Sequence, residues 1–365
     1  MPSKWEMVRL GDVLEYEQPT KYIVENTNYD DGYKTPVLTA GQSFILGYTN
    51  ETSNIFNELP VIIFDDFTTA IKYVDFPFKV KSSAMKILKS TKKAYIKYIY
   101  YYMNTIKADT QLHKRYWISK YADIQAPLPP LSVQQQIADV LDSIASLSSQ
   151  RKQQLEQLDL LVKSRFVEMF GDVLRNDKGW ITEKLETLCK ISRGGSPRPI
   201  DKFLGGTIPW IKIGDATSGN DVYLHETKDF IIEEGIKKSR YIKSGSLIFA
   251  NCGVSLGFAR IITFEGCIHD GWLSFEDIDE RLNKVFFLKS LNQCTNHFRM
   301  TAPDGTQPNL NTGIMKSFKQ IIPPLTLQNQ YIAFVEAADK SKFEIQQGLK
   351  KLELQYNALM QQYFG

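Results

Sequence analysis

The octapeptide PPLSVQQQ occupies residues 129–136, and a close copy, PPLTLQNQ, occupies residues 323–330. Proline cannot continue a helix backwards, because it lacks an N–H and clashes with the preceding turn, so each Pro-Pro pair marks the start of a new helix. Ser132 in the first copy and Thr326 in the second are predicted to cap these helices, and Gln135 completes a capping box in the first. The octapeptides therefore predict two helices that begin in the same way.

The similarity extends well beyond the octapeptides. Residues 129–171 align without a gap with residues 323–365, and eleven aligned positions are identical. In the second copy, apolar residues alternate at intervals of four and three, which is the heptad pattern of a coiled coil: Ile345, Leu349, Leu352, Tyr356, Leu359 and Tyr363. The first copy keeps this rhythm up to a predicted slip near residues 151–154, at Val133, Ile137, Val140, Ile144 and Leu147. After the slip the rhythm resumes, at Leu155, Leu158, Val162, Phe166 and Met169.

These stripes are narrow for helices of about 39 residues, or roughly 58 Å. A helix that packs on a globular core needs a wider apolar face than a coiled-coil seam provides. We therefore expect the two helices to pair with each other. The alternative is that each helix lies on a separate globular core.

Length and composition predict a globular protein with more than one domain. The chain has 365 residues, of which 43% are hydrophobic. No apolar run reaches the ~18–20 residues of a membrane span, and the N-terminus lacks the apolar core of a signal peptide, so a cytoplasmic protein is expected. The four cysteines form no C-x-x-C pair and are interpreted as reduced; His269 near Cys267 lacks a usable ligand set, so no metal site is predicted.

A small net charge of +3 hides a strong asymmetry. Residues 11–66 contain two Lys or Arg against ten Asp or Glu, whereas residues 72–120 contain twelve against two. The run KVKSSAMKILKSTKKAYIKYIYYYM interleaves lysines with tyrosines, a combination that attracts polyanions such as nucleic acid. The same run is equally typical of a solvated helix face, and the sequence leaves both interpretations open.

The two octapeptides divide the chain into four parts, which we predict as globular domains at 1–128 and 172–322 and long helices at 129–171 and 323–365. The globular parts open alike, because KWEMVRLGDVL (4–14) resembles GWITEKLETLC (179–189). Each also contains a buried strand that enters a turn, LPVIIFDDF (59–67) and GSLIFANCG (245–253). The two octapeptides lie 194 residues apart, which is the size of a whole domain. A repeat period of this size indicates a two-fold duplication of domains and not a solenoid.

Both globular parts are predicted to mix helices and strands. Gly-rich turns separate the predicted strands at residues 36–40, 61–67, 210–216, 246–251 and 258–264. Helices are predicted at residues 95–106 and 284–300. The fold class expected from the residues is therefore mixed α/β.

The order of these features resembles the DNA-specificity subunits of type I restriction–modification systems. The resemblance covers the whole chain and is carried by the two octapeptides, by the opening Trp5 and Trp180, by RGGSPRP…GGTIPWIKIGD, and by GTQPNLNTGIMKSFKQIIPPL. It implies two α+β target-recognition domains separated by two long helices that form an antiparallel coiled coil. Each domain would read one half of a bipartite DNA target, and the coiled coil would set the unread gap between the halves.

The resemblance also implies partners. Adenine methylation and ATP-dependent cleavage would belong to separate modification and restriction subunits, with two modification subunits docking on the long helices. No cofactor is expected on this chain, and the methyl donor, ATP and Mg²⁺ would bind to the partner subunits. Independently, two readers on a rigid spacer must meet DNA at a fixed separation, because the major groove faces the same side about every 34–36 Å.

No catalytic signature is recognisable in the sequence. It contains no Asn-Pro-Pro-aromatic segment, no glycine-rich cofactor loop in the right context and no P-loop. The stretch FDDFTTAIKY (64–73), with Asp65 and Asp66, resembles part of a metal-dependent nuclease, but no acidic-x-Lys element follows it. We expect a non-catalytic DNA-binding subunit. The alternatives are a self-contained methyltransferase or nuclease with an unrecognised site, and a coiled-coil adaptor with two peptide-binding domains.

Candidate DNA contacts are polar and basic residues on loops, because such side chains reach base edges and phosphates. In the first domain they are Gln42, Ser43, Thr68, Thr69, Lys81, His113, Lys114 and Arg115. In the second domain they are Arg193, Ser196, Arg198, Asn251, Ser255, His297, Arg299, Thr306, Gln307 and Asn309. The competing interpretation is that these glycine-rich loops are simple turns and that the arginines pair with surface carboxylates.

Overall fold

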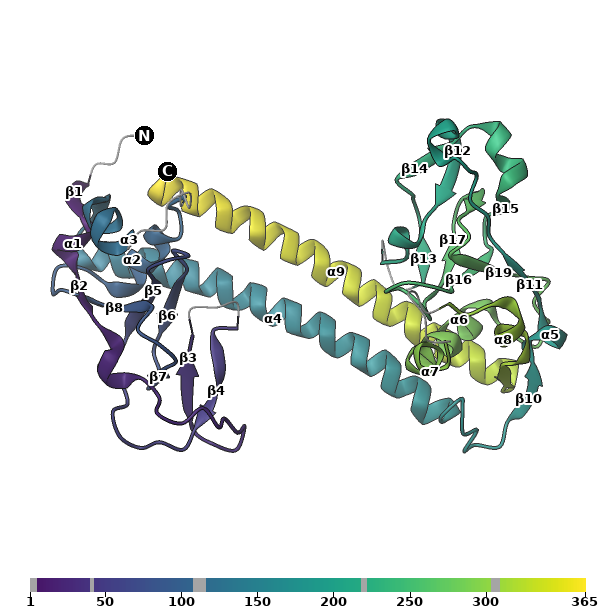
Figure 1. Cartoon of the computed structure of the whole chain (residues 1–365), viewed down its shortest axis with the longest axis horizontal. Helices are drawn as coiled ribbons and strands as arrows, with labels where there is room; N and C mark the ends of the chain where they lie inside the picture. The colour runs from purple at the N-terminus through teal and green to yellow at the C-terminus, as the bar shows by residue number, and fades with distance from the viewer. Residues whose placement is uncertain (1–4, 40–42, 108–115, 218–221, 303–308) are drawn as a thin grey trace. The chain divides into compact units, whose positions relative to one another are not determined.

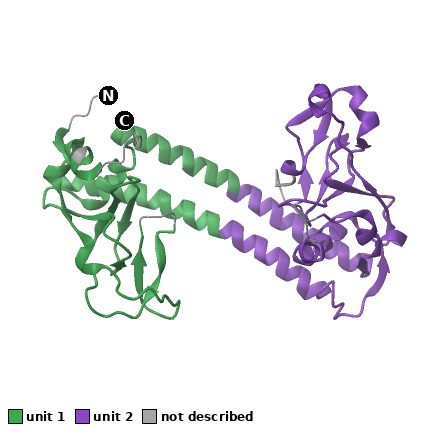
Figure 2. Cartoon of the chain, viewed as in Figure 1, with its two compact units in different colours: residues 1–153, 346–365 green, residues 154–345 purple. Residues whose placement is uncertain are grey.

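The computed structural model describes residues 5–39, 43–107, 116–217, 222–302 and 309–365. The chain divides into two compact units, shown in Figure 2. Unit 1 comprises residues 1–153 and 346–365, and unit 2 comprises residues 154–345. Each unit therefore contains one globular part together with a segment of both long helices.

The two long helices are α4 (Leu131–Phe170) and α9 (Leu325–Phe364), each of 40 residues (Figure 1). In unit 1, Tyr356 and Leu359 near the end of α9 pack against the cluster that holds Ile137 near the start of α4. In unit 2 the ends are exchanged, because the ring of Phe166 near the end of α4 lies 5.4 Å from that of Tyr331 near the start of α9. The predicted antiparallel coiled coil is confirmed.

The seam of α4 differs from the predicted one in its first half. Ile137, Leu141 and Ile144 are buried, whereas Val140 and Leu147 are 41% and 46% exposed. Positions 141, 148, 155, 162 and 169 are spaced by seven and are all buried or half-buried, so the heptads run on without a slip. The predicted slip is wrong, because Ser148 occupies the seam and the apolar Val140 and Leu147 belong to a different, exposed stripe of the helix.

A polar residue also occupies the equivalent seam position of α9. Tyr331, Val335 and Ala338 are buried at intervals of four and three, and the next seam position is Lys342. The ammonium group of Lys342 forms an ion pair with Asp159 of α4 and lies 3.7 Å from Asp339. Polar groups at single seam positions fix the register of a coiled coil at some cost in stability, so this pair favours one alignment of the helices.

The starts of both long helices are held by a buried glutamine and not by the predicted caps. Each helix begins directly after its Pro-Pro pair, and the Pro130 carbonyl accepts from the backbone N–H of Val133 and Gln134 at 2.9 and 3.0 Å. Ser132 therefore lies inside the first turn and is not the N-cap, and Thr326 lies at the equivalent position of α9. The predicted capping box is wrong.

The side chain of Gln134 instead links α4 to the globular part of unit 1. Its Nε2 donates to the Pro129 carbonyl at 2.7 Å, and its Oε1 accepts from the N–H of Tyr95, the N-cap of α2 (Ile96–Met103), at 2.7 Å. Gln328 repeats this arrangement in unit 2, with Pro323 at 2.7 Å and with Asn283, the N-cap of α6 (Lys284–Gln293), at 2.8 Å. Both glutamines are fully buried, so the repeated octapeptide preserves a helix-to-domain clamp.

The globular part of unit 1 consists of three antiparallel or mixed sheets and short helices. A two-stranded sheet pairs β1 (Glu6–Arg9) with β9 (Gln125–Leu128). A four-stranded sheet has the order β2 (Leu14–Glu17), β8 (Met85–Ser90), β5 (Val61–Asp65), β6 (Ile71–Val74). A three-stranded sheet has the order β4 (Ile45–Thr49), β3 (Thr35–Leu38), β7 (Lys79–Val80). The remaining short elements are α1 (Leu10–Val13), η1 (Pro19–Tyr22), α3 (Tyr116–Ser119) and η2 (Tyr121–Asp123).

Unit 2 repeats this plan. The two-stranded sheet pairs β10 (Ile181–Lys184) with β20 (Lys319–Ile322). The larger, five-stranded sheet has the order β11 (Lys190–Arg193), β19 (Trp272–Glu276), β16 (Leu247–Ala250), β17 (Ala259–Ile262), β13 (Tyr223–Leu224). The four-stranded sheet has the order β14 (Asp229–Ile231), β12 (Leu204–Ile211), β18 (Gly266–Ile268), β15 (Arg240–Ile242). The other elements are α5 (Leu185–Leu188), η3 (Ile200–Lys202), η4 (Ile213–Thr217), η5 (Glu233–Lys238), α7 (Thr295–Thr301) and α8 (Thr312–Ser317).

The repeated topology confirms the internal duplication and the mixed α/β class. Most predicted strands and helices are present, but two differ. Only Trp210 and Ile211 of the predicted strand 210–216 continue β12, and the chain then turns into η4. The predicted helix 284–300 is interrupted at Cys294, which separates α6 from α7.

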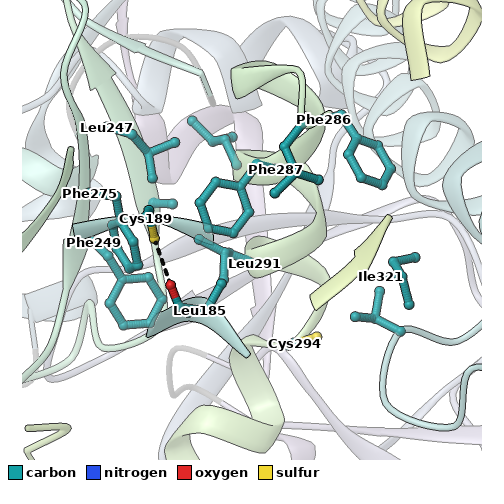
Figure 3. Packing of buried hydrophobic residues seen from close by; sticks show 14 of the residues in the cluster. Leu185, Cys189, Leu247, Phe249, Phe275, Phe286, Phe287, Leu291, Cys294 and Ile321 are labelled. Carbon is teal, nitrogen blue, oxygen red and sulfur yellow. Dashed lines mark hydrogen bonds between the residues drawn. The ribbon is translucent and has the colours of Figure 1, made fainter. Parts of the chain in front are cut away.

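The core of unit 2 lies between its larger sheet and α6, as Figure 3 shows. Phe249 and Phe275 project from the sheet, and Phe287 of α6 packs edge-on against Phe275 at 5.6 Å. Cys189 donates its thiol to the Leu185 carbonyl at 3.4 Å, and burial raises the pKa of this thiol to about 12. All four cysteines are free thiols, as predicted.

Part of the charge asymmetry of unit 1 is neutralised inside the domain. Lysines of the basic run pair with carboxylates of the acidic stretch: Lys79 with Glu51 at 2.5 Å, Lys86 with Asp66 at 3.5 Å, and Lys89 with Glu17 at 2.7 Å and Glu58 at 2.8 Å. Burial opposes ionisation of Glu17, but hydrogen bonds from Lys89, Lys21 and Tyr22 outweigh it and lower its pKa to about 2. Three lysines of the basic run therefore serve the fold of unit 1, whereas Lys81, Lys92 and Lys93 are exposed.

Candidate nucleic-acid interface

Asp270 organises the RGGSPRP loop of unit 2. Its Oδ1 accepts from the hydroxyl of Ser196 at 2.7 Å, and its backbone carbonyl accepts from Nε of Arg193 at 2.9 Å. The Arg198 guanidinium lies 4.0 Å from Oδ2 and is 83% exposed. A Cβ on Gly194 would lie 2.1 Å from the His269 carbonyl, so only glycine lets the loop approach this closely. Three predicted contact residues are thus gathered around one aspartate, two of them at its carboxylate and Arg193 at its backbone carbonyl.

His269, beside Asp270, is a neutral acceptor. The N–H of Gly271 donates to its Nδ1 at 2.9 Å, so this nitrogen carries no proton, although it lies 3.0 Å from the Asp270 carboxylate. Burial lowers the pKa of His269, and the nearby carboxylate only partly offsets this. The close approach is therefore not an ion pair, and the charge of Asp270 remains directed at the arginines and Ser196.

The same turn, residues 269–271, also holds the second predicted loop of unit 2. The N–H of Asn251, directly after β16, donates to the Gly271 carbonyl at 2.9 Å. The Asn251 carbonyl in turn accepts from the N–H of Leu310 at 2.8 Å, and Cys252 forms a β-bridge with Asn309. Three segments far apart in the sequence, around residues 193–199, 251–257 and 309–310, therefore meet at one turn.

Arg299 fixes the outer part of the second loop. Its Nε donates to the Leu256 carbonyl at 3.1 Å and its Nη2 to the Val254 carbonyl at 3.0 Å. Val254 itself is 91% exposed at the tip of the loop. Arg299 thus holds a protruding loop in a defined conformation.

Unit 1 builds the equivalent junction with different side chains. Asp66, directly after β5, donates its N–H to the Ala84 carbonyl at 3.3 Å, and its carbonyl accepts from the N–H of Tyr116 at 3.2 Å. These bonds match those of Asn251 with Gly271 and Leu310. Asp66 additionally lies 3.5 Å from Lys86 and accepts from the N–H of Trp117 at 2.9 Å. Both units therefore hold three loops at the end of the central strand.

The two aspartates of FDDFTTAIKY have structural partners. Asp65 Oδ1 accepts from the N–H groups of Phe67 and Thr68 at 2.7 and 3.0 Å, which forms the turn, and Asp66 is paired with Lys86. Both carboxylates are buried, with exposures of 4% and 3%. Neither is presented to a substrate, so the geometry gives no support to a nuclease site there. Among the described residues, no cluster of His, Cys, Asp and Glu could hold a metal ion.

The predicted contact residues fall into three groups. Those with exposed or half-exposed side chains are Ser43, Thr68, Lys81, Arg193, Ser196, Arg198, His297, Arg299 and Asn309. Those with buried side chains are Thr69, Asn251 and Ser255. Those outside the described residues are Gln42, His113, Lys114, Arg115, Thr306 and Gln307.

Asn251 is unusual among the buried residues. Its side-chain nitrogen and oxygen form no hydrogen bond within the described part of the chain, although the residue is fully buried. It sits where the loops around residues 251–257 and 309–310 join. In its present conformation Asn251 positions backbone and does not present its amide to solvent.

Sequence reasoning missed Asp270, Gln134 and Gln328. Asp270 lies in a turn whose partners in the RGGSPRP loop are 72 or more residues away in sequence, so no local pattern marks it. The two glutamines did carry a signal, because both occupy the same place in the repeated octapeptide. The neighbouring Ser132 and Gln135 match a capping box by residue type, although the structure does not use them in that way.

Comparisons with known proteins agree with this architecture. A family model described as the type I restriction modification DNA specificity domain matches residues 2–157 and 177–354. The type I restriction enzyme EcoR124I/EcoR124II specificity subunit of Escherichia coli is 39% identical over 264 residues, which cover 67% of this chain and 62% of that protein. The matched region thus spans less than two thirds of the length of that relative.

Two further proteins are similar over more of their length. The putative type I restriction enzyme specificity subunit S.HindORF215P of Haemophilus influenzae is 23% identical over 337 residues, covering 84% of this chain and 80% of that protein. The crystal structure of the type I restriction–modification S subunit from M. genitalium has a TM-score of 0.64 at 14% identity and covers 100% of this chain and 97% of that chain. The structural likeness shows a shared fold, and the family match extends over both globular parts. The chain belongs to the type I restriction–modification DNA specificity family.

Proposed function

We propose that this chain is the non-catalytic DNA-recognition subunit of a type I restriction–modification complex and reads a bipartite target. Residues 1–128 and 172–322 are proposed as the two target-recognition domains. Each would bind one half-site, and the paired helices α4 and α9 would set the unread gap. Methylation and cleavage would be carried out by modification and restriction subunits, which would bind the methyl donor, ATP and Mg²⁺.

One observation carries this proposal: the same three-loop junction occurs in both units. Asp66 and Asn251 occupy equivalent places after the central strand, and each bonds through its backbone to a neighbouring turn and to a distant segment. Binding residues tend to lie on loops that a rigid scaffold holds in place. A duplicated junction, joined to a common helix pair, is what a reader of two separate half-sites requires.

The side chains proposed to contact DNA are those that combine exposure with a defined loop. In unit 2 these are Arg193, Ser196 and Arg198 around Asp270 and the loop tip held by Arg299. In unit 1 they are Ser43, Thr68 and Lys81. Asn251, Ser255 and Thr69 are proposed to shape the loops, because their side chains are buried.

Binding-site selection with the purified chain and random duplexes tests the function. We expect two fixed base blocks at a constant separation, with affinity that falls as salt rises because phosphate contacts release counterions. One continuous block, or a variable separation, would contradict bipartite reading. An absence of selected sequence would favour the adaptor interpretation.

The proposed docking of modification subunits is supported by apolar side chains that the helix pair leaves exposed. Leu160 of α4 and Leu354 of α9 occupy equivalent positions of the repeat and are 61% and 63% exposed. Leu131 and Leu325 form a second equivalent pair, at 48% and 42%. Isolated exposed leucines are ordinary, but their recurrence at repeated positions indicates two equivalent surfaces, as two identical partners would need. Among the described residues, no helix has the length and apolarity to cross a membrane.

Replacing both leucines, Leu160→Asp with Leu354→Asp, should abolish co-purification with the modification subunits while DNA binding by the chain alone remains within about two-fold. A charge at the centre of a protein interface is costly because it is desolvated without a partner. Gln157→Asp with Gln355→Asp, at exposed positions of the same helices, is the matched control. Equal recovery of the subunits with both double variants would place the docking surface elsewhere.

A further inference from the structure

A cleft of about 490 Å³ opens in unit 2 beside the loop that Arg299 holds. Its walls come from α4, from β17 and the residue before it, from α6 and α7, and from Tyr331 of α9. Four cationic side chains line it, each from a different element: Lys163, Arg260, Lys289 and Arg299. Among the described residues of the lining, these four cations outnumber the single carboxylate, Asp159, which forms an ion pair with Lys342.

Three of the four cationic side chains, Arg260, Lys289 and Arg299, are held in place by the fold, whereas Lys163 is exposed. Arg260 and Lys289 are only 5% and 8% exposed, and Nη1 of Arg260 donates to the Ala259 carbonyl at 2.9 Å. The guanidinium groups of Arg260 and Arg299 both lie over the ring of Phe258, at 5.5 and 5.7 Å from its centroid. Because these side chains are already ordered, an anion that enters the cleft would not have to immobilise them, which removes part of the entropic cost of binding.

The cleft is continuous with the proposed reading loop. Arg299 lines the cleft and also donates two hydrogen bonds to the Val254 and Leu256 carbonyls. DNA held against this loop would bring its backbone close to the cleft, and phosphates provide most of the sequence-independent affinity.

Unit 1 repeats this charge arrangement only in part. Counted from the helix N-caps Asn283 and Tyr95, Lys289 corresponds to Tyr101, whose hydroxyl donates to Asp142 at 2.5 Å. Lys163 corresponds to Asn357 in the helix repeat. Arg260 pairs with Ile248 in its sheet as Lys72 pairs with Ile63, so unit 1 shares this cation and lacks those of Lys163 and Lys289.

We propose that this cleft binds backbone phosphates of DNA next to the half-site read by unit 2, an inference that rests on the proposed DNA-reading function. Lys163 and Lys289 would act as phosphate contacts from opposite walls, and Arg299 would couple phosphate binding to the conformation of the reading loop. Because phosphates carry no base information, the cleft would add affinity without changing the target sequence.

The test compares Lys163→Glu and Lys289→Met with Lys340→Glu, an exposed lysine of α9 in the same unit that lies outside the cleft lining. Each cleft variant should weaken binding of target and of random duplex by the same factor, about 3–10-fold. Each should also lower the slope of log affinity against log salt by about 0.9, the value for one lost phosphate contact. Lys340→Glu should leave the slope within error of the wild type, and circular dichroism should confirm that all variants are folded.

The outcomes separate this inference from the proposed function. If the wild-type chain selects a bipartite sequence but the cleft variants keep its affinity and salt slope, the cleft inference is wrong and the function stands. If the variants bind DNA normally but lose the modification subunits, the cleft is an acidic-peptide site and the inference is again wrong. Saturable binding of pyrophosphate alone, with DNA affinity unaffected by the variants, would assign the cleft to a small phosphate compound and also overturn it.

Discussion

A variant with seven residues inserted after Arg151 and seven after Ile345 should select a target whose unread gap is longer by up to about three base pairs. Arg151 and Ile345 are equivalent positions of the helix repeat, and both lie outside the buried clusters of the two units. One heptad preserves the seam, because positions 141, 148, 155, 162 and 169 keep their spacing of seven. It lengthens each helix by about 10.5 Å, and a base pair rises about 3.4 Å.

The measurement is the affinity of each variant for duplexes that carry both half-sites at a series of separations. Affinity for the natural separation should fall by about 10³-fold, the lower end of the ratio between specific and non-specific binding. The half-site sequences should not change, since neither recognition domain is altered. The control inserts seven residues after Arg151 only, which leaves the helices of unequal length and should give no tight binding at any separation. An unchanged preferred separation in the double insertion would show that the helices do not act as the ruler.

The long helices and the duplication could be predicted from the sequence because both are periodic. A heptad stripe repeats every seven residues, and the octapeptides recur 194 residues apart. The duplication extends to the globular parts, as in the equivalent backbone bonds of Leu10 with Ile124 and of Leu185 with Phe318. Periodicity alone did not identify the seam in the first half of α4. Apolar side chains at Val140 and Leu147 follow a helical rhythm, and the sequence does not reveal which of two stripes faces the partner helix.

The recognition surface was harder to predict, because its geometry depends on contacts between distant residues. The RGGSPRP loop stays a predicted DNA contact, and the residue that organises it, Asp270, lies in another sheet connection that the sequence does not link to it. Asn251 looked like a reader because it follows a strand, yet packing against Gly271 and Leu310 buries it. Charge counting was equally limited, since Lys79, Lys86 and Lys89 find carboxylates that are distant in the sequence.

Replacing Gln134 with alanine should destabilise unit 1 by about 2–4 kcal/mol, and replacing Gln328 should have the same effect on unit 2. Each substitution leaves a buried backbone N–H and a buried carbonyl without their partners: Tyr95 and Pro129 in one unit, Asn283 and Pro323 in the other. A buried group left unsatisfied costs roughly 1–3 kcal/mol. The long helices would also lose a direct connection to the recognition domains, so the distance between the half-sites should become less sharply defined.

Hydrogen exchange of single amides distinguishes this clamp from general packing. In Gln134→Ala the Tyr95 amide should exchange about 10–100-fold faster while the Asn283 amide is unchanged, and Gln328→Ala should show the reverse, because each amide loses its acceptor only in its own variant. Gln134→Met retains the side-chain volume without the hydrogen bonds and should behave like the alanine variant. Gln135→Ala and Gln330→Ala, at the exposed neighbouring positions, are the controls. If the Tyr95 amide exchanged at the same rate in Gln134→Ala and Gln135→Ala, the clamp would be refuted. The Pro-Pro helix start alone would then explain why the octapeptide is repeated.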